Sequence, residues 1–459
     1  MWERRVDVVM ILDRISLSHC GCFWLAVPTL EYPLERRHYR KIPMGGNLST
    51  KNSKAIFSTP DGAIGITYAF AQKYAKYMPF EMKMPVLTPR KVALIKENWA
   101  AICRGTNAFN PERHGSTDKF FHRTLYGLLF AVMPSLRCIF RSSLTMQGKS
   151  FASVVKVMTS VMTTNNIAER MQALARGHLK FGVRREDYTT MGVTFIRALE
   201  IISGDTWTKE IRDAYMTAYC LLYYLLLPVI AHNEPEPAKE CIPATVTSIE
   251  IVSNNARRLT ISYDFPLRFQ PGDGILLGIG QHKRCFPIAS FPNKPSSTLE
   301  LVVDLATSDW ICRYSVASQL RLFWVESSVN FEVDTPEAVP RRVLLVSHGL
   351  DAVPFVTMMK GLSAIRESYD GNVVALQVAD SFDEIQGLQP PELTAWSQCS
   401  IHQAHTVTKD KLLEVTPKLA QTDLYVAGPP DFIAQVEREY LAAGGRKRVH
   451  VYSLDRYNR

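Results

Sequence analysis

The pattern of apolar and polar residues changes at residues 232–243, which divides this 459-residue chain into two parts of different fold class. The stretch reads HNEPEPAKECIP and is charged and rich in proline, as is typical of a linker. Residues 88–230, before it, show helical periodicity without strand alternation. The residues after it alternate as β-strands do, so we expect a multidomain chain, which its length also favours.

The helical part begins with a clear start signal. Thr88 is expected to cap a helix whose first residue is Pro89, because threonine suits the N-cap and proline the first turn. Val92, Ile95 and Trp99 then fall on one face of that helix. Further helical runs are expected at about 116–132, 146–163, 167–177, 185–202 and 207–230.

The part after the linker contains two kinds of β pattern. ATVTSIEIV, RRLTISYDF and STLELVVDL read as strands of one antiparallel sheet. Strands and helices then alternate, which predicts a parallel-sheet α/β domain. The alternating elements are RRVLLVSH, a helix near 352–367, NVVALQVA, DLYVAG, a helix near 430–443, and RVHVYSL.

Composition narrows the class of protein. The net charge of +9 could indicate an anionic partner, but lysine and arginine are spread along the whole chain, so we expect no nucleic-acid partner. The nine cysteines include no CxxC pair, which favours a reducing compartment and a cytoplasmic location. The longest apolar run, LLYYLLLPVI at 221–230, is shorter than a membrane span and reads as a buried helix.

The N-terminal region contains a lipidation pattern. Met44 is followed by GGNLSTKNSK, and M-G-x-x-x-S is the signal for N-myristoylation of the glycine, here Gly45. Lys51 and Lys54 would then support a weak membrane association, because one acyl chain binds membranes only marginally. This interpretation requires Met44 to be the true start. A chance match inside a flexible leader is the alternative, and the sequence leaves both open.

Three stretches of the helical part read PSLRCIF, TMQGKSF and RGHLKFGVRREDY, and they resemble the haem-binding motifs of globins. In PSLRCIF, Phe140 stands where globins have the phenylalanine that packs on the haem face. In TMQGKSF, Gln147 takes the ligand-facing position and Phe151 lies one turn further on, bulkier than the usual leucine. In RGHLKFGVRREDY, the resemblance implies that His178 is the proximal ligand of the iron of haem b.

Two tyrosines sharpen the resemblance to flavohaemoglobins. Tyr126, fourteen residues before Phe140, matches their ligand-side tyrosine, and Tyr188, ten residues after His178, matches the tyrosine that contacts the proximal histidine. A neutral imidazole binds haem iron when its second nitrogen has a fixed partner, which Tyr188 can provide. Tyr126 and Gln147 can donate hydrogen bonds to bound dioxygen. Each residue taken alone could be an ordinary buried helix residue.

The second half resembles the reductase module of the same family, which carries FAD and then NAD(P)H. RFQPGDGILL and RCFPIAS resemble its strand-turn and flavin motif, and the latter places Arg284 where a guanidinium pairs with the FAD phosphate. Phe286, Ser290 and Ser308 are the further candidate FAD contacts. SHGLDAVP and LYVAGPPDF resemble the dinucleotide motifs, with the candidate contacts Gly349, Gly428 and Pro429.

Several positions depart from that pattern. Phe286 and Pro287 replace the expected Tyr and Ser, so a hydroxyl and a backbone N–H that could bind flavin are lost. Asp351 replaces a glycine and opposes the charge of a pyrophosphate. Tyr452 and Leu454 stand for the acid and aromatic near the flavin, and Ile230 stands for the glutamate that supports the proximal tyrosine. These departures weaken the case for NAD(P)H more than that for FAD.

We therefore expect an all-α globin, then an antiparallel β-barrel, then an α/β nucleotide-binding-like domain. The expected bounds are an N-terminal extension over 1–86 that is partly disordered, the globin over 87–232, a linker over 233–243, the FAD-type reductase barrel over 244–337 and the NAD-binding-like domain over 338–459.

The resemblance implies a haem protein that binds dioxygen and oxidises NO to nitrate. Tyr126, Gln147 and Tyr188 are its expected catalytic residues. Electrons would come from its own FAD and NAD(P)H module or from an external reductase. Two alternatives remain open: a haem-based gas or redox sensor with an inactive reductase-like module, and an oxygen-binding globin with that module as a scaffold.

Overall fold

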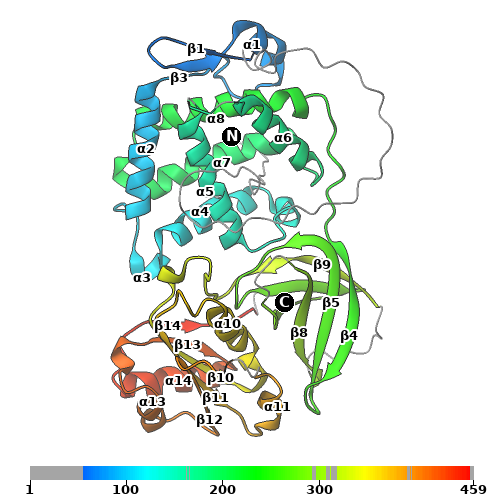
Figure 1. Ribbon diagram of the computed structural model, residues 1–459, viewed down its shortest axis with the longest axis vertical. Helices are drawn as coiled ribbons and strands as arrows, with labels where there is room; N and C mark the ends of the chain where they lie inside the picture. Colours follow the sequence, from blue (N-terminus) through cyan, green and yellow to red (C-terminus); the bar gives the residue numbers. More distant parts are fainter. Residues whose placement is uncertain are drawn as a thin grey trace. The chain divides into compact units, whose positions relative to one another are not determined.

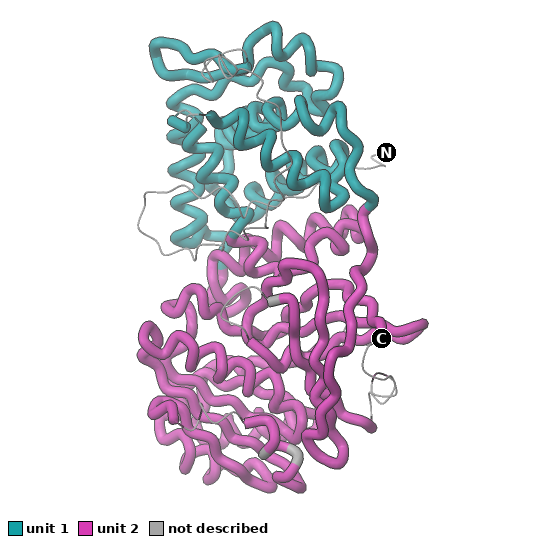
Figure 2. The backbone as a smooth tube through the Cα atoms, turned by 45° about the vertical axis from the view of Figure 1, so that its right-hand side comes forward, with its two compact units in different colours: residues 1–109, 150–237 teal, residues 110–149, 238–459 magenta. Residues whose placement is uncertain are grey.

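The computed structural model describes residues 55–454 apart from 162, 165, 292–295, 307–310, 312–317, 390–392 and 394. The chain divides into two compact units (Figure 2). Unit 1 takes its described residues from 1–109 and 150–237, and unit 2 from 110–149 and 238–459. Residues 110–149, which the sequence places inside a globin domain, thus belong to the same compact unit as both sheets of the second half.

The helices follow the predicted pattern closely. Helix α2 (Pro89–Arg104) begins where expected, with the Oγ1 of Thr88 accepting the backbone N–H of Lys91 at 3.3 Å. Helix α5 (Leu144–Ser160) begins in unit 2 and ends in unit 1. The other helical elements of unit 1 after residue 150 are α6 (Ile167–Leu179), α7 (Asp187–Ser203), η5 (Gly204–Thr206) and α8 (Lys209–Ile230).

Helix α8 lies in the core of unit 1 (Figure 1). It has 22 residues and is apolar enough to cross a membrane by length and composition, but 83% of its most apolar window is buried inside the protein. Tyr215, Tyr223 and Tyr224 are among the largest fully buried side chains among the described residues. The interpretation of 221–230 as part of a buried helix is therefore confirmed.

A small subdomain before α2 was not predicted. Its strands β1 (Ile56–Ser58), β2 (Ile64–Ile66) and β3 (Val86–Leu87) form an antiparallel sheet, joined by α1 (Tyr68–Tyr74) and η3 (Ala75–Tyr77). The subdomain is held to α8, since the hydroxyl of Tyr224 donates to the carbonyl of Lys83 at 2.7 Å. Residues 55–86, expected to be part of a partly disordered extension, are thus ordered; Gly45 and the rest of 1–54 lie outside the described residues.

Unit 2 begins with helices that dock on an antiparallel sheet. These are α3 (Pro111–His114), α4 (Thr117–Val132), η4 (Pro134–Cys138) and the first turns of α5. The guanidinium of Arg141 donates to the carbonyls of Phe323 at 2.6 Å and Glu240 at 3.2 Å. The amide of Ser143 donates to the carbonyl of Arg268 at 2.8 Å. This segment is therefore fixed to the sheet through both side chains and backbone.

The antiparallel sheet has six strands in the order β7-β6-β9-β4-β5-β8. Leu259, Ile261 and Tyr263 alternate along β5 with more exposed residues, so one face builds the core. Ile288, just after β7, forms an isolated antiparallel bridge with Leu301 of β8. The expected closed barrel is not seen among the described residues. The strands are β4 (Ile242–Ile251), β5 (Ala256–Leu267), β6 (Gly274–Ile279), β7 (His282–Pro287), β8 (Ser296–Asp304) and β9 (Gln319–Glu326).

The C-terminal sheet is parallel throughout, as the alternating pattern predicted. Its five strands run in the order β12-β11-β10-β13-β14, so the first strand of the domain is central. The chain turns from one side of β10 to the other, which creates a topological switch point between β10 and β13. The elements from 336 onward are η6 (Pro336–Ala338), β10 (Arg342–His348), η7 (Gly349–Ala352), α10 (Val353–Ala364), β11 (Asn372–Val378), α11 (Asp383–Gln386), β12 (Cys399–Ala404), α13 (Lys409–Val415), η8 (Leu419–Gln421), β13 (Asp423–Ala427), α14 (Pro430–Ala442) and β14 (Val449–Val451).

Candidate functional site

A buried histidine–tyrosine pair lies in unit 1. His178 is in the last turn of α6, Tyr188 is in the first turn of α7, and both are buried. The imidazole Nδ1 of His178 lies 2.7 Å from the hydroxyl of Tyr188. A tight turn between the helices makes the approach possible: Gly182 has φ +83°, and the amide of Val183 donates back to the carbonyl of His178.

The environment of Tyr188 keeps it neutral and fixed. Burial raises the pKa of Tyr188 well above its ordinary value. Its backbone carbonyl accepts a hydrogen bond from the hydroxyl of Tyr219 at 2.5 Å, and the ring of Tyr223 packs edge-on at 6.2 Å. When the oxygen of Tyr188 accepts the Nδ1–H of His178, the lone pair of that ring is left on Nε2, where a metal ion can bind it.

The wall around His178 is apolar. A cavity of about 30 Å³ touches His178 and Tyr188. Sites for drug-sized ligands measure about 300 Å³ or more, so this cavity by itself is too small to enclose such a ligand. The described residues contain no group of three or more His, Cys, Asp or Glu that could hold a metal ion. A single histidine is an ordinary protein ligand of haem iron. The remaining lining residues are Val154, Val157, Met171, Leu174, Tyr219, Leu222, Tyr223 and Leu226.

Phe151 belongs to the helical core of unit 1. Its ring is buried and meets that of Phe195 with 5.2 Å between centroids. Phe195 in turn packs on Tyr215 of α8. A large side chain at this position therefore fills space between α5, α7 and α8.

The candidate residues of the ligand side lie in unit 2. Tyr126 in α4 and Phe140 are buried, and their rings meet edge-to-face at 5.2 Å. Gln147 lies in the first turns of α5, and its Oε1 is buried without a hydrogen-bond partner among the described residues. A buried amide oxygen without a partner is costly, and a water or another hydrogen-bond donor would relieve that cost. The structure thus brings Tyr126 and Phe140 together and leaves Gln147 able to take up a further group.

Sequence reasoning missed His122, one turn before Tyr126 in α4. The imidazole lies directly against Gly148 of α5, where an added Cβ would overlap the ring, and its Nδ1 finds no partner among the described residues. Burial lowers the pKa of His122 to about 4; Glu332 opposes this shift, and Lys149 and Lys119 add to it. The imidazole is therefore neutral at pH 7. Only its one-turn spacing from Tyr126 could have indicated a role.

The residues expected to contact FAD are in different environments. Arg284 is half-buried in β7, with its guanidinium 5.8 Å from the ring centroid of Phe286. Phe286 is buried in the core of the antiparallel sheet. The Oγ of Ser290 accepts the backbone N–H of Glu300 at 2.9 Å. Ser308 lies outside the described residues. Arg284 suits a phosphate, whereas Phe286 offers no hydroxyl to a flavin.

The C-terminal segment packs against the same part of the sheet. Leu454 is buried, and a Cβ added at Gly274 would lie 2.6 Å from its methyl group. Tyr452 is buried beside Phe355, and its hydroxyl finds no partner among the described residues. This orphan hydroxyl fits the polar edge of a bound cofactor such as a flavin.

The dinucleotide candidates gather at the switch point of the parallel sheet. Gly349 follows β10, and Gly428 and Pro429 follow β13, at the same edge, because these strands pair in register from Val343 to Ser347. Gly349 has φ +52°, which favours glycine. Asp351 stands in the turn before α10, where its carboxylate opposes a pyrophosphate. The switch point of the parallel sheet is therefore a suitable position for a ligand, but the carboxylate of Asp351 disfavours an anionic one.

Comparisons with known proteins agree with this arrangement. Over 148 residues the chain is 28% identical to a flavohaemoprotein of Deinococcus radiodurans, a match that covers 31% of this chain and 34% of the relative. The match thus spans about a third of the length of that relative. No protein-family model matches the chain.

Two solved structures are among those to which this chain is similar. A flavohaemoglobin from Malassezia yamatoensis, with bound FAD and haem, is 14% identical over 80% of this chain and 100% of that chain, with a TM-score of 0.40. The FAD/NAD-binding domain of a nitric oxide dioxygenase from Vibrio cholerae is 17% identical over 46% of this chain and 98% of that chain, with a TM-score of 0.38. Both scores are low, so neither structure assigns roles to residues of this chain.

The chain thus combines a helical region that contains a buried histidine–tyrosine pair with an antiparallel sheet and a parallel α/β sheet. Similarity to the curated flavohaemoprotein confirms the resemblance to flavohaemoglobins that the sequence motifs indicated.

Proposed function

We propose that this protein is a haem-binding oxidoreductase that combines NO with dioxygen to give nitrate. The reaction NO + O₂ + e⁻ → NO₃⁻ takes one electron for each turnover. The observation that carries the proposal is the buried pair of His178 and Tyr188, 2.7 Å apart, beside an apolar wall. Similarity to a flavohaemoprotein supports it.

Each candidate residue of the haem site would have its own role. Haem, when bound, would supply the iron that binds dioxygen and passes on the electron. His178 would bind the iron through Nε2, and Tyr188 would hold the imidazole in one tautomer and orientation through Nδ1. Tyr126 and Gln147 would donate hydrogen bonds toward the bound ligand, and Phe140 would pack on the haem. A low-dielectric site strengthens such bonds.

The electrons would come from FAD in the reductase-like module or from an external reductase. Arg284 and the orphan hydroxyl of Tyr452 support FAD binding. Asp351, at the expected pyrophosphate site, argues against efficient use of NAD(P)H and favours an external donor. The proposed setting is cytoplasmic, with weak membrane association if Gly45 is acylated.

An absorption spectrum tests the proposal. Purified protein should show a Soret band. His178→Ala should lose the haem but keep the near-ultraviolet circular dichroism of its packed aromatic side chains, such as Tyr215 in α8, which shows that the variant is still folded. An unchanged Soret band in His178→Ala would overturn the ligand assignment. Anaerobic NADH or NADPH then reports electron supply: reduction of the iron shows that the attached module works. With the iron reduced chemically and dioxygen then admitted, NO should be consumed with nitrate formed in equal amount.

A second candidate function rests on the reductase-like module. Phe286 in the sheet core and Asp351 at the dinucleotide turn favour a haem-based gas or redox sensor. Its reductase-like module would be catalytically inactive and would serve for signalling or for binding a partner protein. Three results together would support this candidate. The protein would contain haem but no flavin, its Soret band would not change on addition of NADH or NADPH, and no nitrate would form.

A further inference from the structure

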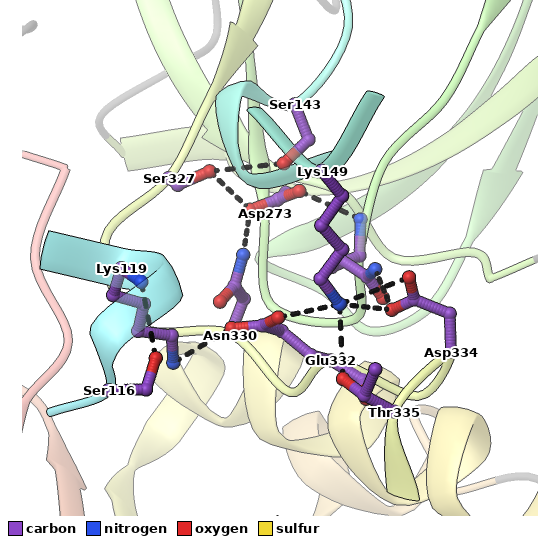
Figure 3. A network of polar contacts seen from close by, with 11 residues as sticks. Ser116, Lys119, Ser143, Lys149, Asp273, Ser327, Asn330, Glu332, Asp334 and Thr335 are labelled. Carbon is purple, nitrogen blue, oxygen red and sulfur yellow. Dashed lines mark hydrogen bonds and ion pairs between the residues drawn. The ribbon is translucent and has the colours of Figure 1, made fainter. Parts of the chain in front are cut away.

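Two lysines from the helices of unit 2 meet a buried carboxylate on the loop after β9 (Figure 3). The Nζ of Lys149, in α5, lies 2.7 Å from Glu332 and 3.1 Å from Asp334. It also donates to the hydroxyl of Thr335 at 3.0 Å. Lys119, in α4, lies 3.2 Å from the other oxygen of Glu332. The side chains of Lys149 and Glu332 are only 8% and 6% exposed, so this is a buried ion cluster.

The pKa shifts of Glu332 and Lys149 both favour their charged forms. Burial alone would raise the pKa of Glu332, but Lys119 and Lys149 outweigh it and lower that pKa. Burial alone would lower the pKa of Lys149, but Glu332 and Asp334 outweigh it and raise that pKa. Because the opposite charges compensate each other, removing one would leave a buried charge unpaired. The cluster therefore fixes the position of the second turn of α5.

A second anchor holds the residue just before α5. The hydroxyl of Ser143 lies 3.5 Å from that of Ser327, which donates to Asp273 at 2.7 Å (Figure 3). Asp273 is fully buried and also accepts from Asn330 at 2.8 Å and from the amide of Gln270 at 2.7 Å. Burial raises the pKa of Asp273, and the hydrogen bonds from these donors oppose that shift in part.

The two anchors are joined to each other. The side-chain amide of Gln270 donates to Asp334 at 2.7 Å, which links the turn before β6 to the ion cluster. Between the anchors, Gly148 lies against the imidazole of His122 without room for a side chain. Gln147, with its unpartnered buried Oε1, is thus enclosed by fixed points at Ser143, Gly148 and Lys149.

We propose that Glu332, with Asp334 and Asp273, positions Gln147 for the bound ligand. Loops of the reductase-like antiparallel sheet would then set the hydrogen bonding on the ligand side of the haem. The inference rests on the proposed haem function, and it makes these carboxylates positioning residues rather than catalytic ones. Local helix propensity alone would not fix a glutamine in the first turns of a helix so closely, because helix ends fray.

The test is Glu332→Gln in the full-length haem-loaded protein. We expect the carbon–oxygen stretch of the carbonmonoxy form to shift as the hydrogen bond from Gln147 weakens. Dioxygen release should accelerate by about fivefold, the factor for losing one hydrogen bond of ordinary strength. Asp334→Asn, at a partly exposed carboxylate, is a milder second variant if Glu332→Gln does not fold. Asp423→Asn, which removes a partly buried partner of Lys447 in the parallel sheet, is the matched control.

A double substitution separates positioning from general loosening. In a Gln147→Leu background, Glu332→Gln should change neither the stretch nor the release rate, because the group it positions is gone. Equal effects in both backgrounds, or no effect in either carboxylate variant, would overturn the inference.

A haem-free measurement keeps the two proposals apart. Hydrogen exchange of the amides of 144–149 should be faster in Glu332→Gln than in Asp423→Asn even without haem. Slow exchange in both variants would contradict the anchoring. Absence of a Soret band in the wild-type protein would instead reject the haem function, while faster exchange would still support the anchoring.

Discussion

Replacing His122 should make unit 2 less sensitive to acid. The folded protein lowers the pKa of His122 from its ordinary value of 6.5 to about 4 through burial. Below pH 6.5 the unfolded chain takes up a proton on this imidazole that the folded protein refuses. The stability that the neutral imidazole contributes is therefore complete above pH 6.5 and is lost as the pH falls toward 4.

The size of the effect follows from the shift. A difference of about 2.5 pKa units at about 1.4 kcal/mol each gives roughly 3 kcal/mol lost between pH 7 and pH 4. His122→Gln keeps a polar side chain of similar size but does not titrate. Its free energy of unfolding should therefore fall less over this range than that of the wild type, by about 2 to 3 kcal/mol.

Urea unfolding at a series of pH values measures this difference. The slope of unfolding free energy against pH should separate the two proteins between pH 6.5 and pH 4 and coincide above it. His282→Gln, which removes an exposed histidine of unit 2, controls for the loss of any histidine. Parallel curves for wild type and His122→Gln would refute the reasoning, because they would mean that the folded protein protonates His122 freely.

Three further outcomes are expected. Gly148→Ala should destabilise the protein by about 1 to 3 kcal/mol in thermal unfolding, because its methyl group would overlap the imidazole of His122; Gly177→Ala, where an added Cβ meets nothing, is the control. Phe80→Ala should lower the free energy of unfolding in urea by about 3 to 5 kcal/mol, since Phe80 packs edge-on against Tyr219 at 5.8 Å. A loss below 1 kcal/mol would show that the subdomain does not pack as part of the core of unit 1. Tyr126→Phe should speed dioxygen release in stopped-flow experiments, because one donor is lost, and an unchanged rate would exclude Tyr126 from the site.

The features that the sequence predicted well are local ones. His178 and Tyr188 are ten residues apart, and one tight turn between two helices brings them together. Helix α2 begins at Pro89 because its signal, Thr88 followed by proline, depends only on neighbouring residues. The parallel sheet could be predicted equally well, because its strands and helices alternate along the chain.

The features that the sequence did not predict depend on residues far apart. Lys149 and Glu332 are separated by 183 positions, and neither has a pattern that names its partner. The strands of residues 55–87 are two or three residues long, too short for alternation to be recognised. The expected closed barrel was inferred from resemblance, and strand patterns alone do not say whether a sheet closes.

The assignment of residues 110–149 to unit 2 has a consequence for how the chain can be divided. The sequence suggests that the chain could be cut in the linker at 232–243. Such a cut would separate this segment from the sheet that Arg141 contacts and from the loop that Lys149 contacts. An amino-terminal fragment ending there should expose an apolar and cationic face and aggregate. Any exchange of the second half of the chain for another would therefore have to keep the loop that carries Glu332 together with residues 110–149.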